Sequence, residues 1–284
     1  MPIGAHLPTS KGFQAALEHA QELGCDCLQI FSKSPRQWNA TALDETTAAS
    51  FRAAWKNSGF WPLVVHDSYL INLAAPEEAK RQKSVAAMID EVHRAELLGC
   101  DFLVTHCGAH LQKDCGAQGE DAGLKNLAIS LQEVLEATPQ AKVKIALENT
   151  AAQGTCLGGP FEHLGRVLRE VNSDRLAVCF DTCHAFAAGH DVASENGLKS
   201  TLKNFEEAVG LEWLAVVHLN DSKGMLGKHL DRHEHIGQGL IGEDGMRRIL
   251  NEPRLKDKPF ILETPEVETM IEVNLATVRD LQKV

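Results

Sequence analysis

Short apolar runs alternate with amphipathic segments along this chain of 284 residues. The apolar runs, which predict buried strands, cover residues 2–5, 27–31, 63–65, 102–105, 143–147, 176–180, 214–217 and 260–262. Runs without a polar face are typical of a parallel sheet covered on both sides, because neither side of such a strand meets water. The pattern therefore predicts eight strands of one parallel sheet.

The segments between the runs carry apolar residues three and four positions apart, as one face of a helix requires. In the first segment Phe13, Leu17 and Ala20 share a face. Ser10 is the expected N-cap of this helix and Gly24 its expected end. The further predicted helices cover residues 46–58, 77–98, 122–137, 161–171, 197–209, 242–250 and 267–281. Each predicted strand is thus followed by a helix.

Strict alternation of strands and helices predicts an α/β fold with parallel pairing and right-handed crossovers. A doubly wound open sheet would satisfy the same order of elements. Eight units in 284 residues, with chemically active residues near most strand ends, fit a closed TIM (β/α)8 barrel better. No linker or low-complexity segment divides the chain, so we expect one domain over residues 1–284.

Six of the apolar runs are followed directly by a residue that can bind a metal ion. These residues are His66, His106, Glu148, Asp181, His218 and Glu263. In a parallel barrel all of them would lie at the carboxyl ends of the strands, which is where such barrels keep their active sites. Without cations, three imidazoles and three carboxylates at one rim would repel each other or lack solvation, whereas zinc or manganese takes these ligands directly.

Two predicted loops, residues 181–184 and 231–233, add His184, Asp231 and His233 as candidates. In an extended Asp-x-His segment the two side chains point the same way, so Asp231 and His233 could share one ion. The chain has 13 histidines, about twice the usual number, although a single histidine is more often packed or solvated than bound to metal. We assign that ordinary role to the remaining histidines, which are His6, His19, His93, His110, His163, His190, His229 and His235.

The composition restricts the cellular setting more than the function. No apolar run approaches the roughly 20 residues of a membrane span, and the first residues lack the features of a signal peptide, so we expect a cytoplasmic protein without a membrane partner. The eight cysteines are scattered and form no C-x-x-C pair, which favours reduced thiols. A formal net charge of −11 argues, taken alone, against a nucleic-acid partner.

Several ordered segments carry a resemblance over almost the whole chain. They are Ile3-Gly4-Ala5-His6, Arg36-Gln37-Trp38, His66-Asp67-Ser68-Tyr69-Leu70-Ile71-Asn72-Leu73, Leu147-Glu148-Asn149-Thr150, Asp181-Thr182-Cys183-His184-Ala185-Phe186-Ala187-Ala188-Gly189, His218-Leu219-Asn220-Asp221-Ser222-Lys223, Asp231-Arg232-His233 and Leu262-Glu263-Thr264. With these segments the sequence resembles the endonuclease IV family of apurinic/apyrimidinic (AP) endonucleases.

The resemblance implies a xylose-isomerase-like TIM barrel with three Zn²⁺ ions per chain, one of which Mn²⁺ could replace. The implied ligands are His66, His106 and Glu148 for the first ion, Glu148, Asp181, His218 and Glu263 for the second, and His184, Asp231 and His233 for the third. Glu148, Glu263 and Asp231 are the candidate catalytic residues. Three divalent ions carry six positive charges against the four negative charges of the acidic ligands, which would leave the site positive within an acidic protein.

The implied reaction is that of a deoxyribonuclease IV, a phosphoric diester hydrolase of DNA base excision repair. It hydrolyses the phosphodiester 5′ to an abasic nucleotide in duplex DNA, giving a 3′-hydroxyl and a 5′-deoxyribose phosphate, and we expect trimming of blocked 3′ ends as well. An enzyme cannot recognise an abasic site by contacts to a base, so it must exploit how readily the abasic nucleotide leaves the helix. By resemblance, Arg36, Tyr69 and Leu70 enter the duplex from the minor groove, with Gln37 and Asn72 nearby. We expect a monomer.

Two other functions fit parts of the pattern. A metal-dependent sugar isomerase on the same barrel would also gather Glu, Asp and His at strand ends, but it gives no role to Arg36 and Tyr69. A non-catalytic zinc protein that binds damaged DNA is the alternative outside enzymes, although structural zinc sites are usually closed by four protein ligands. Cys107 stands where relatives often have proline, and we expect Cys107 and Cys183 to pack rather than bind metal.

Overall fold

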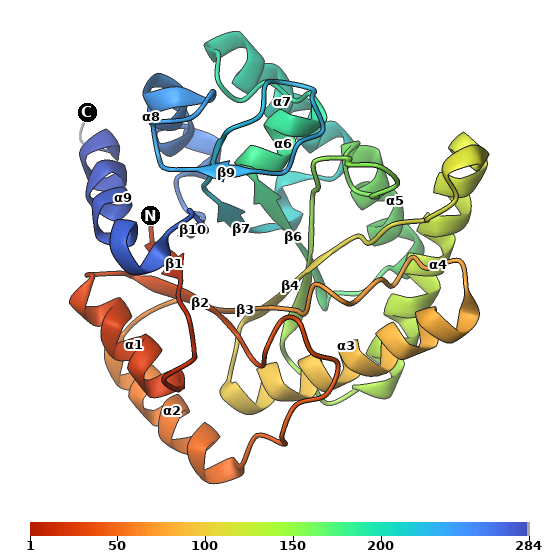
Figure 1. Cartoon of the computed structure of the whole chain (residues 1–284), viewed down its shortest axis with the longest axis horizontal. Helices are drawn as coiled ribbons and strands as arrows, with labels where there is room; N and C mark the ends of the chain where they lie inside the picture. The colour runs from red at the N-terminus through yellow and green to blue at the C-terminus, as the bar shows by residue number, and fades with distance from the viewer. Residues whose placement is uncertain (283–284) are drawn as a thin grey trace.

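Eight parallel strands form a closed barrel in the computed structural model, which describes residues 1–282 (Figure 1). The barrel strands are β1 (Ile3–His6), β2 (Cys27–Phe31), β3 (Leu63–His66), β4 (Phe102–His106), β5 (Lys144–Glu148), β6 (Leu176–Asp181), β7 (Leu214–His218) and β10 (Phe260–Leu262). Neighbours in the chain are neighbours in the barrel, and β10 pairs with β1 to close it. The predicted TIM (β/α)8 barrel is confirmed.

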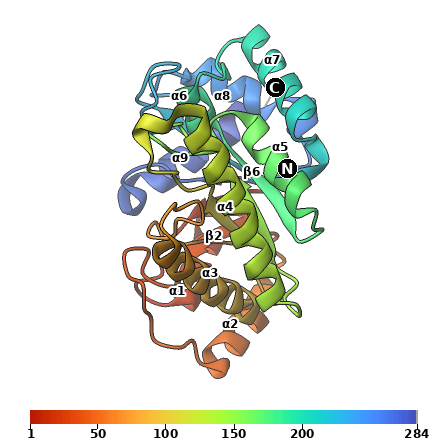
Figure 2. The same cartoon turned by 90° about the vertical axis from the view of Figure 1, so that its right-hand side faces the viewer.

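Helices surround the barrel on its outer side, as Figures 1 and 2 show from two directions. They are α1 (Phe13–Glu22), α2 (Glu45–Ser58), α3 (Glu78–Leu98), α4 (Gly116–Ala137), α5 (Phe161–Val171), α7 (Glu195–Ala208), α8 (Gly242–Leu250) and α9 (Val267–Gln282). All eight predicted helices are present, most of them within two residues of the expected ends. The last helix, α9, lies beside the first strand, so the two ends of the chain complete the ring together (Figure 1).

The apolar core has two parts because each strand is covered on both faces. The larger part lies between the strands and the helices, where Phe161, Phe180 and Phe205 pack against one another. The smaller part fills the barrel itself with the side chains of Cys27, Val64, Val104, Ala146, Ala177, Cys179, Val216 and Ile261. Burial on both faces explains why the strands appeared in the sequence as continuous apolar runs.

Two predictions about local structure are wrong. Helix α1 begins at Phe13 rather than after Ser10, because the N–H of Gly12 closes a turn onto the carbonyl of Thr9 and Gly12 takes the N-cap position with φ 96°. Residues 182–184 are not a loop but the start of helix α6 (Thr182–Ala188). Because nearly every residue of α6 is buried, its sequence has no polar face to reveal it.

Several short elements lie between the strands and helices of the barrel. An antiparallel pair, β8 (Asp221–Ser222) with β9 (His233–Glu234), follows β7. Three 3₁₀ turns cover Lys113–Cys115, Leu211–Trp213 and Pro253–Leu255. All eight cysteines are free in the structure, as expected. Among the described residues, no helix combines the length and the apolarity that crossing a membrane requires.

Close packing between α5 and α7 depends on a glycine. A Cβ on Gly165 would lie 1.8 Å from the carbonyl oxygen of Ala208, the last residue of α7. We expect Gly165→Ala to lower the free energy of unfolding by about 1–3 kcal/mol, because the helices must separate to admit the methyl group. The exposed neighbour Glu162 offers a control, and Glu162→Gln should change stability by less than about 0.5 kcal/mol. Equal urea midpoints for both variants would contradict the proposed contact.

Candidate metal centre

The strands deliver five of the candidate ligands as their last residues rather than directly after them. His66 ends β3, His106 ends β4, Glu148 ends β5, Asp181 ends β6 and His218 ends β7, and Glu263 follows β10. The parallel register places His106 opposite Glu148 and Asp181 opposite His218. The barrel therefore gathers these side chains at one rim, as the sequence predicts.

Glu148 occupies the centre of the group and is fully buried. Its Oε2 lies 3.3 Å from Nε2 of His66 and 3.3 Å from Nε2 of His106. Its Oε1 lies 3.1 Å from Nδ1 of His218 and 3.2 Å from Nδ1 of His184. One carboxylate thus faces four imidazoles, two on each oxygen.

Asp181 and Glu263 join Glu148 and His218 in a second group of donor atoms. Oε2 of Glu263 is 3.1 Å from Nδ1 of His218. The side-chain amide of Asn220 donates to Oδ2 of Asp181 (2.7 Å), and its carbonyl oxygen accepts the backbone N–H of Glu263 (2.8 Å). Asn220 therefore holds the two acidic residues in fixed positions relative to each other.

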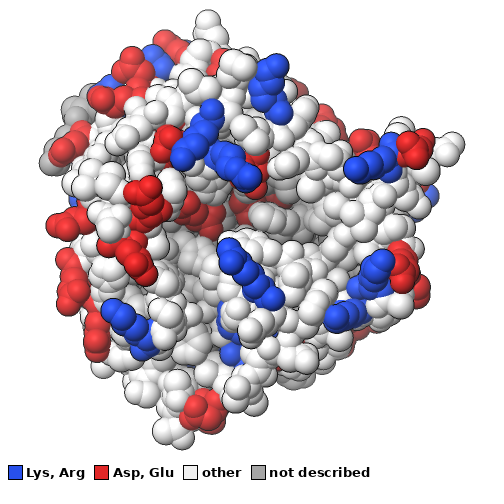
Figure 3. All heavy atoms as spheres, in the orientation of Figure 1, with Lys and Arg blue, Asp and Glu red and all other residues white. Residues whose placement is uncertain are grey.

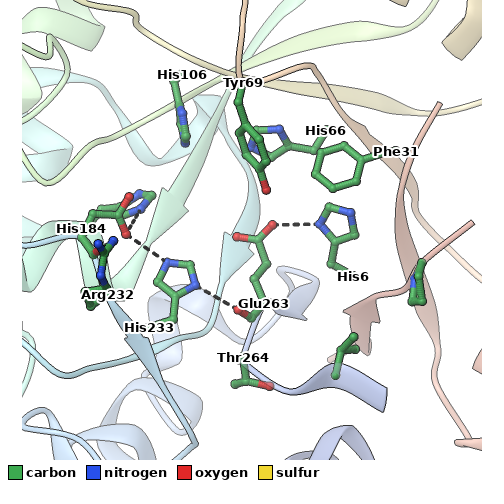
Figure 4. A pocket seen from close by; sticks show the side chains of 13 residues that line it. His6, Phe31, His66, Tyr69, His106, His184, Arg232, His233, Glu263 and Thr264 are labelled. Atoms are coloured by element: carbon green, nitrogen blue, oxygen red, sulfur yellow. Dashed lines mark hydrogen bonds and ion pairs between the residues drawn. The ribbon is translucent and has the colours of Figure 1, made fainter. Parts of the chain in front are cut away.

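Helix α6 positions the third group. Asp181 is its N-cap, and Oδ1 accepts the backbone N–H of His184 at 2.7 Å, which fixes the turn from which the His184 ring extends. Nε2 of His184 lies 3.3 Å from Oδ1 of Asp231, and Nε2 of His233 lies 3.6 Å from the same oxygen. His233 turns this nitrogen inward because its Nδ1 is held by the carbonyl of Glu263 at 2.9 Å (Figure 4).

The structure brings all nine candidate ligands together in the three sets that the resemblance implies. In each set the donor atoms lie within 4.8 Å of one another, and the sets are His66, His106 and Glu148; Glu148, Asp181, His218 and Glu263; and His184, Asp231 and His233. Two further groups include a thiol, namely Cys179 with Glu148 and His218, and Cys183 with Asp181 and His233. That these side chains bind metal stays a prediction.

The donor atoms fit metal ions better than they fit one another. Nε2 of His184 and Nε2 of His233 are buried and have no hydrogen-bond partner among the described residues. Donor atoms about 2.0–2.1 Å from one tetrahedral zinc ion lie roughly 3.3 Å apart. The contacts of His66, His106 and His184 with carboxylate oxygens have this length, which is long for a charged hydrogen bond.

The charged histidines and carboxylates of this group stabilise each other. Burial lowers the pKa of His66, but the carboxylates of Glu148 and Glu263 outweigh it and raise that pKa to about 9. Burial also acts against ionised Glu148, yet the imidazoles around it hold its pKa well below the usual value. For Asp231, burial again favours the neutral form, but His184 outweighs it and lowers the pKa to about 2. A cation that binds here would replace protons on the histidines.

The thiols near the centre are neutral when no cation is bound. Burial raises the pKa of Cys179 and that of Cys183 to about 12, so both are protonated near neutral pH. Metal binding requires the thiolate. Cys107 is fully buried too and directs its Sγ at the carbonyl of Glu148, 3.6 Å away. The geometry is consistent with the packing role expected for Cys107 and Cys183.

Sequence reasoning missed the residues that orient the ligands. Gln29 in β2 contacts His218, Glu263 and His6. The signal that could have revealed it is its position as a polar residue inside an apolar run. Asn149 clamps the end of β6, since its side chain bonds both the N–H (2.7 Å) and the carbonyl (3.0 Å) of Asp181. Asn149 and Asn220 each follow a ligand closely in the chain, which is the pattern that could have revealed them.

An open cavity of about 520 Å³ lies above the centre (Figure 4). It is lined by residues of all three sets and by His6, Phe31, Tyr69 and Arg232. A second cavity of about 260 Å³ adjoins it and shares Tyr69, His106, His184 and Asp231. Figure 3 shows acidic side chains at the floor of the hollow and Lys and Arg side chains on the surface around it.

The predicted DNA-contacting residues lie on two joined segments beside this hollow. Arg36 and Gln37 are exposed, and Tyr69 is 59% exposed while its ring packs against Phe31 with centroids 5.5 Å apart. Leu70 is partly exposed. The hydroxyl of Ser68 donates to the carbonyl of Pro35 at 2.8 Å, which joins the two segments.

Asn72 differs from the other four in its contacts. Its Nδ2 donates to the carbonyl of Ala109 (2.9 Å), and its Oδ1 accepts the backbone N–H groups of Ala109 (3.0 Å) and Ala74 (3.2 Å). The amide is thus used within the protein and ties the Tyr69 segment to the segment that follows His106. The predicted DNA contact of Asn72 stays untested, and its contacts here fix the shape of the rim.

Comparison with known proteins gives a consistent result. Residues 17–281 match the family model described as xylose isomerase-like TIM barrel. The chain is 44% identical to a probable endonuclease 4 of Chloroflexus aurantiacus, over 98% of this chain and 97% of the relative. It is also 44% identical to one of Methanosphaerula palustris, over 99% and 97%.

Solved structures show the same relationship. The crystal structure of endonuclease IV from Thermus thermophilus superposes with a TM-score of 0.86 at 40% identity, covering 99% of this chain and 98% of that one. A D-tagatose 3-epimerase-like protein superposes with a TM-score of 0.72 over 100% of this chain and 96% of that one, but at 20% identity. The second likeness shows the fold alone.

The third set of donors offers a test of the metal centre. We expect the purified protein to bind three divalent transition-metal ions per chain and His233→Ala to lose one of them, because His184 and Asp231 alone leave the third set incomplete. His235→Ala is the matched control, since His235 lies two residues away and belongs to none of the sets. Elemental analysis after dialysis gives the counts. Three retained ions in His233→Ala would contradict the assignment.

Proposed function

The chain belongs to the endonuclease IV family, and from this membership we propose that it is a DNA repair nuclease that hydrolyses the phosphodiester on the 5′ side of an abasic nucleotide in duplex DNA. The observation that carries the proposal is the shared carboxylate of Glu148, which contacts histidines of all three donor sets beneath an open cavity. Phosphodiester hydrolysis by clustered cations needs adjoining cation sites and room for a phosphate, and the adjoining donor sets and the open cavity support the proposal on both points.

We propose Zn²⁺ as the ion at all three positions, with Mn²⁺ acceptable at one. The donor set of imidazoles and carboxylates suits both ions. When bound, such ions lower the pKa of water and offset negative charge on a phosphate. The first and third sets supply three protein donors each, which leaves room for a further ligand, as catalytic rather than structural zinc sites do.

The side chains themselves hold this arrangement before any substrate arrives. Glu148 would join the first two ions, Glu263 would complete the second and Asp231 would face the third, which is why we propose these three as the catalytic carboxylates. Asn149 and Asn220 fix Asp181, and the carbonyl of Glu263 fixes His233. Donors fixed in advance do not need to reorganise during the reaction, and this is a main source of enzymatic rate enhancement.

The substrate would be selected by the cost of opening the helix. A nucleotide without a base loses little stacking when it leaves the duplex, so an enzyme that extrudes its target favours it. We propose that Tyr69, Leu70 and Arg36 occupy the space left in the duplex and that Gln37 contacts its edge. Tyr69 is suited to stacking, because its ring is supported from below by Phe31 and stays largely exposed. Although the ring is exposed, the hydroxyl group is partly desolvated and lies near carboxylates, which raises the pKa of Tyr69 to about 12 and keeps its phenol neutral.

The products would be a 3′-hydroxyl and a 5′-deoxyribose phosphate. The same centre would remove phosphate-linked blocking groups from 3′ ends, because that reaction breaks the same kind of bond. We further propose that the protein acts in the cytoplasm as a monomer with one catalytic domain.

Glu148→Gln should abolish incision. The amide cannot join two cations, so we expect the rate of cleavage 5′ to an abasic analogue in a duplex to fall by at least about 10³-fold. Glu234→Gln is the matched control, because Glu234 lies near the rim outside the three sets and should leave the rate unchanged. A fully zinc-loaded wild-type protein that leaves the duplex intact would refute the proposed function, and turnover of a free sugar would favour the isomerase.

Tyr69→Ala should weaken recognition rather than chemistry. Loss of one stacking ring is worth about 1–3 kcal/mol, so we expect Kd for an abasic duplex to rise roughly 5- to 150-fold. Metal content should stay at the wild-type level. Trp61→Ala removes another half-exposed aromatic side chain, which lines a separate cavity away from the metal centre, and should not change Kd. Equal affinities of Tyr69→Ala and the wild type would rule out stacking by Tyr69.

A further inference from the structure

The only strongly polar side chain in the β2 run Cys27–Phe31 is Gln29, and it is fully buried. A buried amide is costly unless all of its donors and acceptors are satisfied. Gln29 meets this requirement with three contacts, and two of them are to candidate ligands of the second ion. We propose that Gln29 is a positioning residue that fixes the second metal site by orienting both His218 and Glu263.

The orientation of the amide follows from its partners. The side-chain nitrogen lies 2.6 Å from Oε1 of Glu263, and the side-chain oxygen lies 2.8 Å from Nε2 of His218. A carboxylate can only accept hydrogen bonds when ionised, so the group facing Glu263 must be the NH₂. The amide oxygen is then directed at His218, and this oxygen can only accept.

The contact with Gln29 decides which nitrogen of His218 is free for metal. Because the amide oxygen accepts, Nε2 of His218 must carry a proton. In the neutral ring the lone pair then resides on Nδ1, which lies 3.1 Å from Oε1 of Glu148 and 3.1 Å from Oε2 of Glu263. Without metal a proton on Nδ1 would satisfy these two carboxylate oxygens, and a bound cation would take the place of that proton. Gln29 thereby presents the nitrogen that the second donor set requires.

The same amide selects the oxygen that Glu263 offers. Gln29 and Nδ1 of His6, at 3.0 Å, both contact Oε1 of Glu263, as the dashed line to His6 in Figure 4 indicates. Oε2 remains directed at His218. The amide nitrogen also lies 2.9 Å from Nδ1 of His6. When that ring nitrogen carries no proton it accepts the second N–H of Gln29, and both N–H groups of the amide then have partners. One side chain outside the donor sets thus holds two ligands from different strands.

The proposal rests on the metal centre of the proposed function but is tested without DNA. Gln29→Met keeps the length and shape of the side chain and removes its hydrogen bonds. We expect this variant to bind one of the three Zn²⁺ ions roughly 10- to 100-fold more weakly, measured by competition with a chromophoric chelator, and the other two with unchanged affinity. Cys27→Ala, two residues earlier on the same buried face of β2, is the control and should bind all three ions as the wild type does.

Equal Zn²⁺ affinities in Gln29→Met and the wild type would overturn the proposal, as would equal weakening of all three ions. A second measurement needs no variant and applies even if Gln29→Met does not fold. In the zinc-loaded wild type, ¹⁵N NMR of the histidine rings should show Nε2 of His218 protonated and Nδ1 bound to metal. The reverse assignment would show that Gln29 does not set the tautomer. Failure of DNA incision with an intact second site would instead count against the proposed function alone.

Discussion

Four carboxylates and five imidazoles are held at one end of the barrel, five of them buried and four partly exposed, and the rest of the site is arranged around this concentration of charge. Each carboxylate lowers the cost of a charged histidine and each histidine lowers the cost of a charged carboxylate, as the opposite pKa shifts of His66 and Glu148 show. These contacts do not satisfy every donor atom, because Nε2 of His184 and Nε2 of His233 have no hydrogen-bond partner among the described residues. Cations would satisfy both without any change of the fold.

The barrel makes such a concentration possible because its strands end at the same rim. Parallel register places donors from neighbouring strands opposite each other, and closure of the barrel by β10 on β1 brings Glu263 and His6 beside strands from the middle of the chain. The amides of Asn149, Asn220 and Gln29 then hold the candidate ligands, and none of these amides adds charge. Neutral partners are favourable here, since a further carboxylate would add to the repulsion and a further cation would compete with the metal.

Much of this arrangement was readable from the sequence because it depends on residue type at strand ends. The apolar runs predicted the strands, and the residues that end or follow six of them are candidate ligands. The division into three sets came instead from the resemblance, since spacing cannot show which side chains share an oxygen of Glu148. Helix α6 was missed because its buried sequence has no periodicity, and Gln29 because a single polar residue in an apolar strand does not reveal which strand it faces. These are properties of tertiary packing.

Net charge is a poor guide to what this cleft attracts. The formal charge of −11 belongs to the whole chain, whereas a phosphate in the cleft responds to charges within about 8 Å at physiological ionic strength. Acidic groups on the outer face of a helix are separated from the barrel by the helix itself, about 10 Å across, and are largely screened. The acidic side chains form the floor of the hollow, and bound cations would reverse the sign of the charge there. Lys and Arg side chains lie on the surface around the hollow (Figure 3). Under the proposed function, an acidic surface elsewhere would weaken non-specific binding to intact DNA while leaving the attraction at the cleft, and affinity would then depend on metal loading and on the two segments that carry Arg36 and Tyr69.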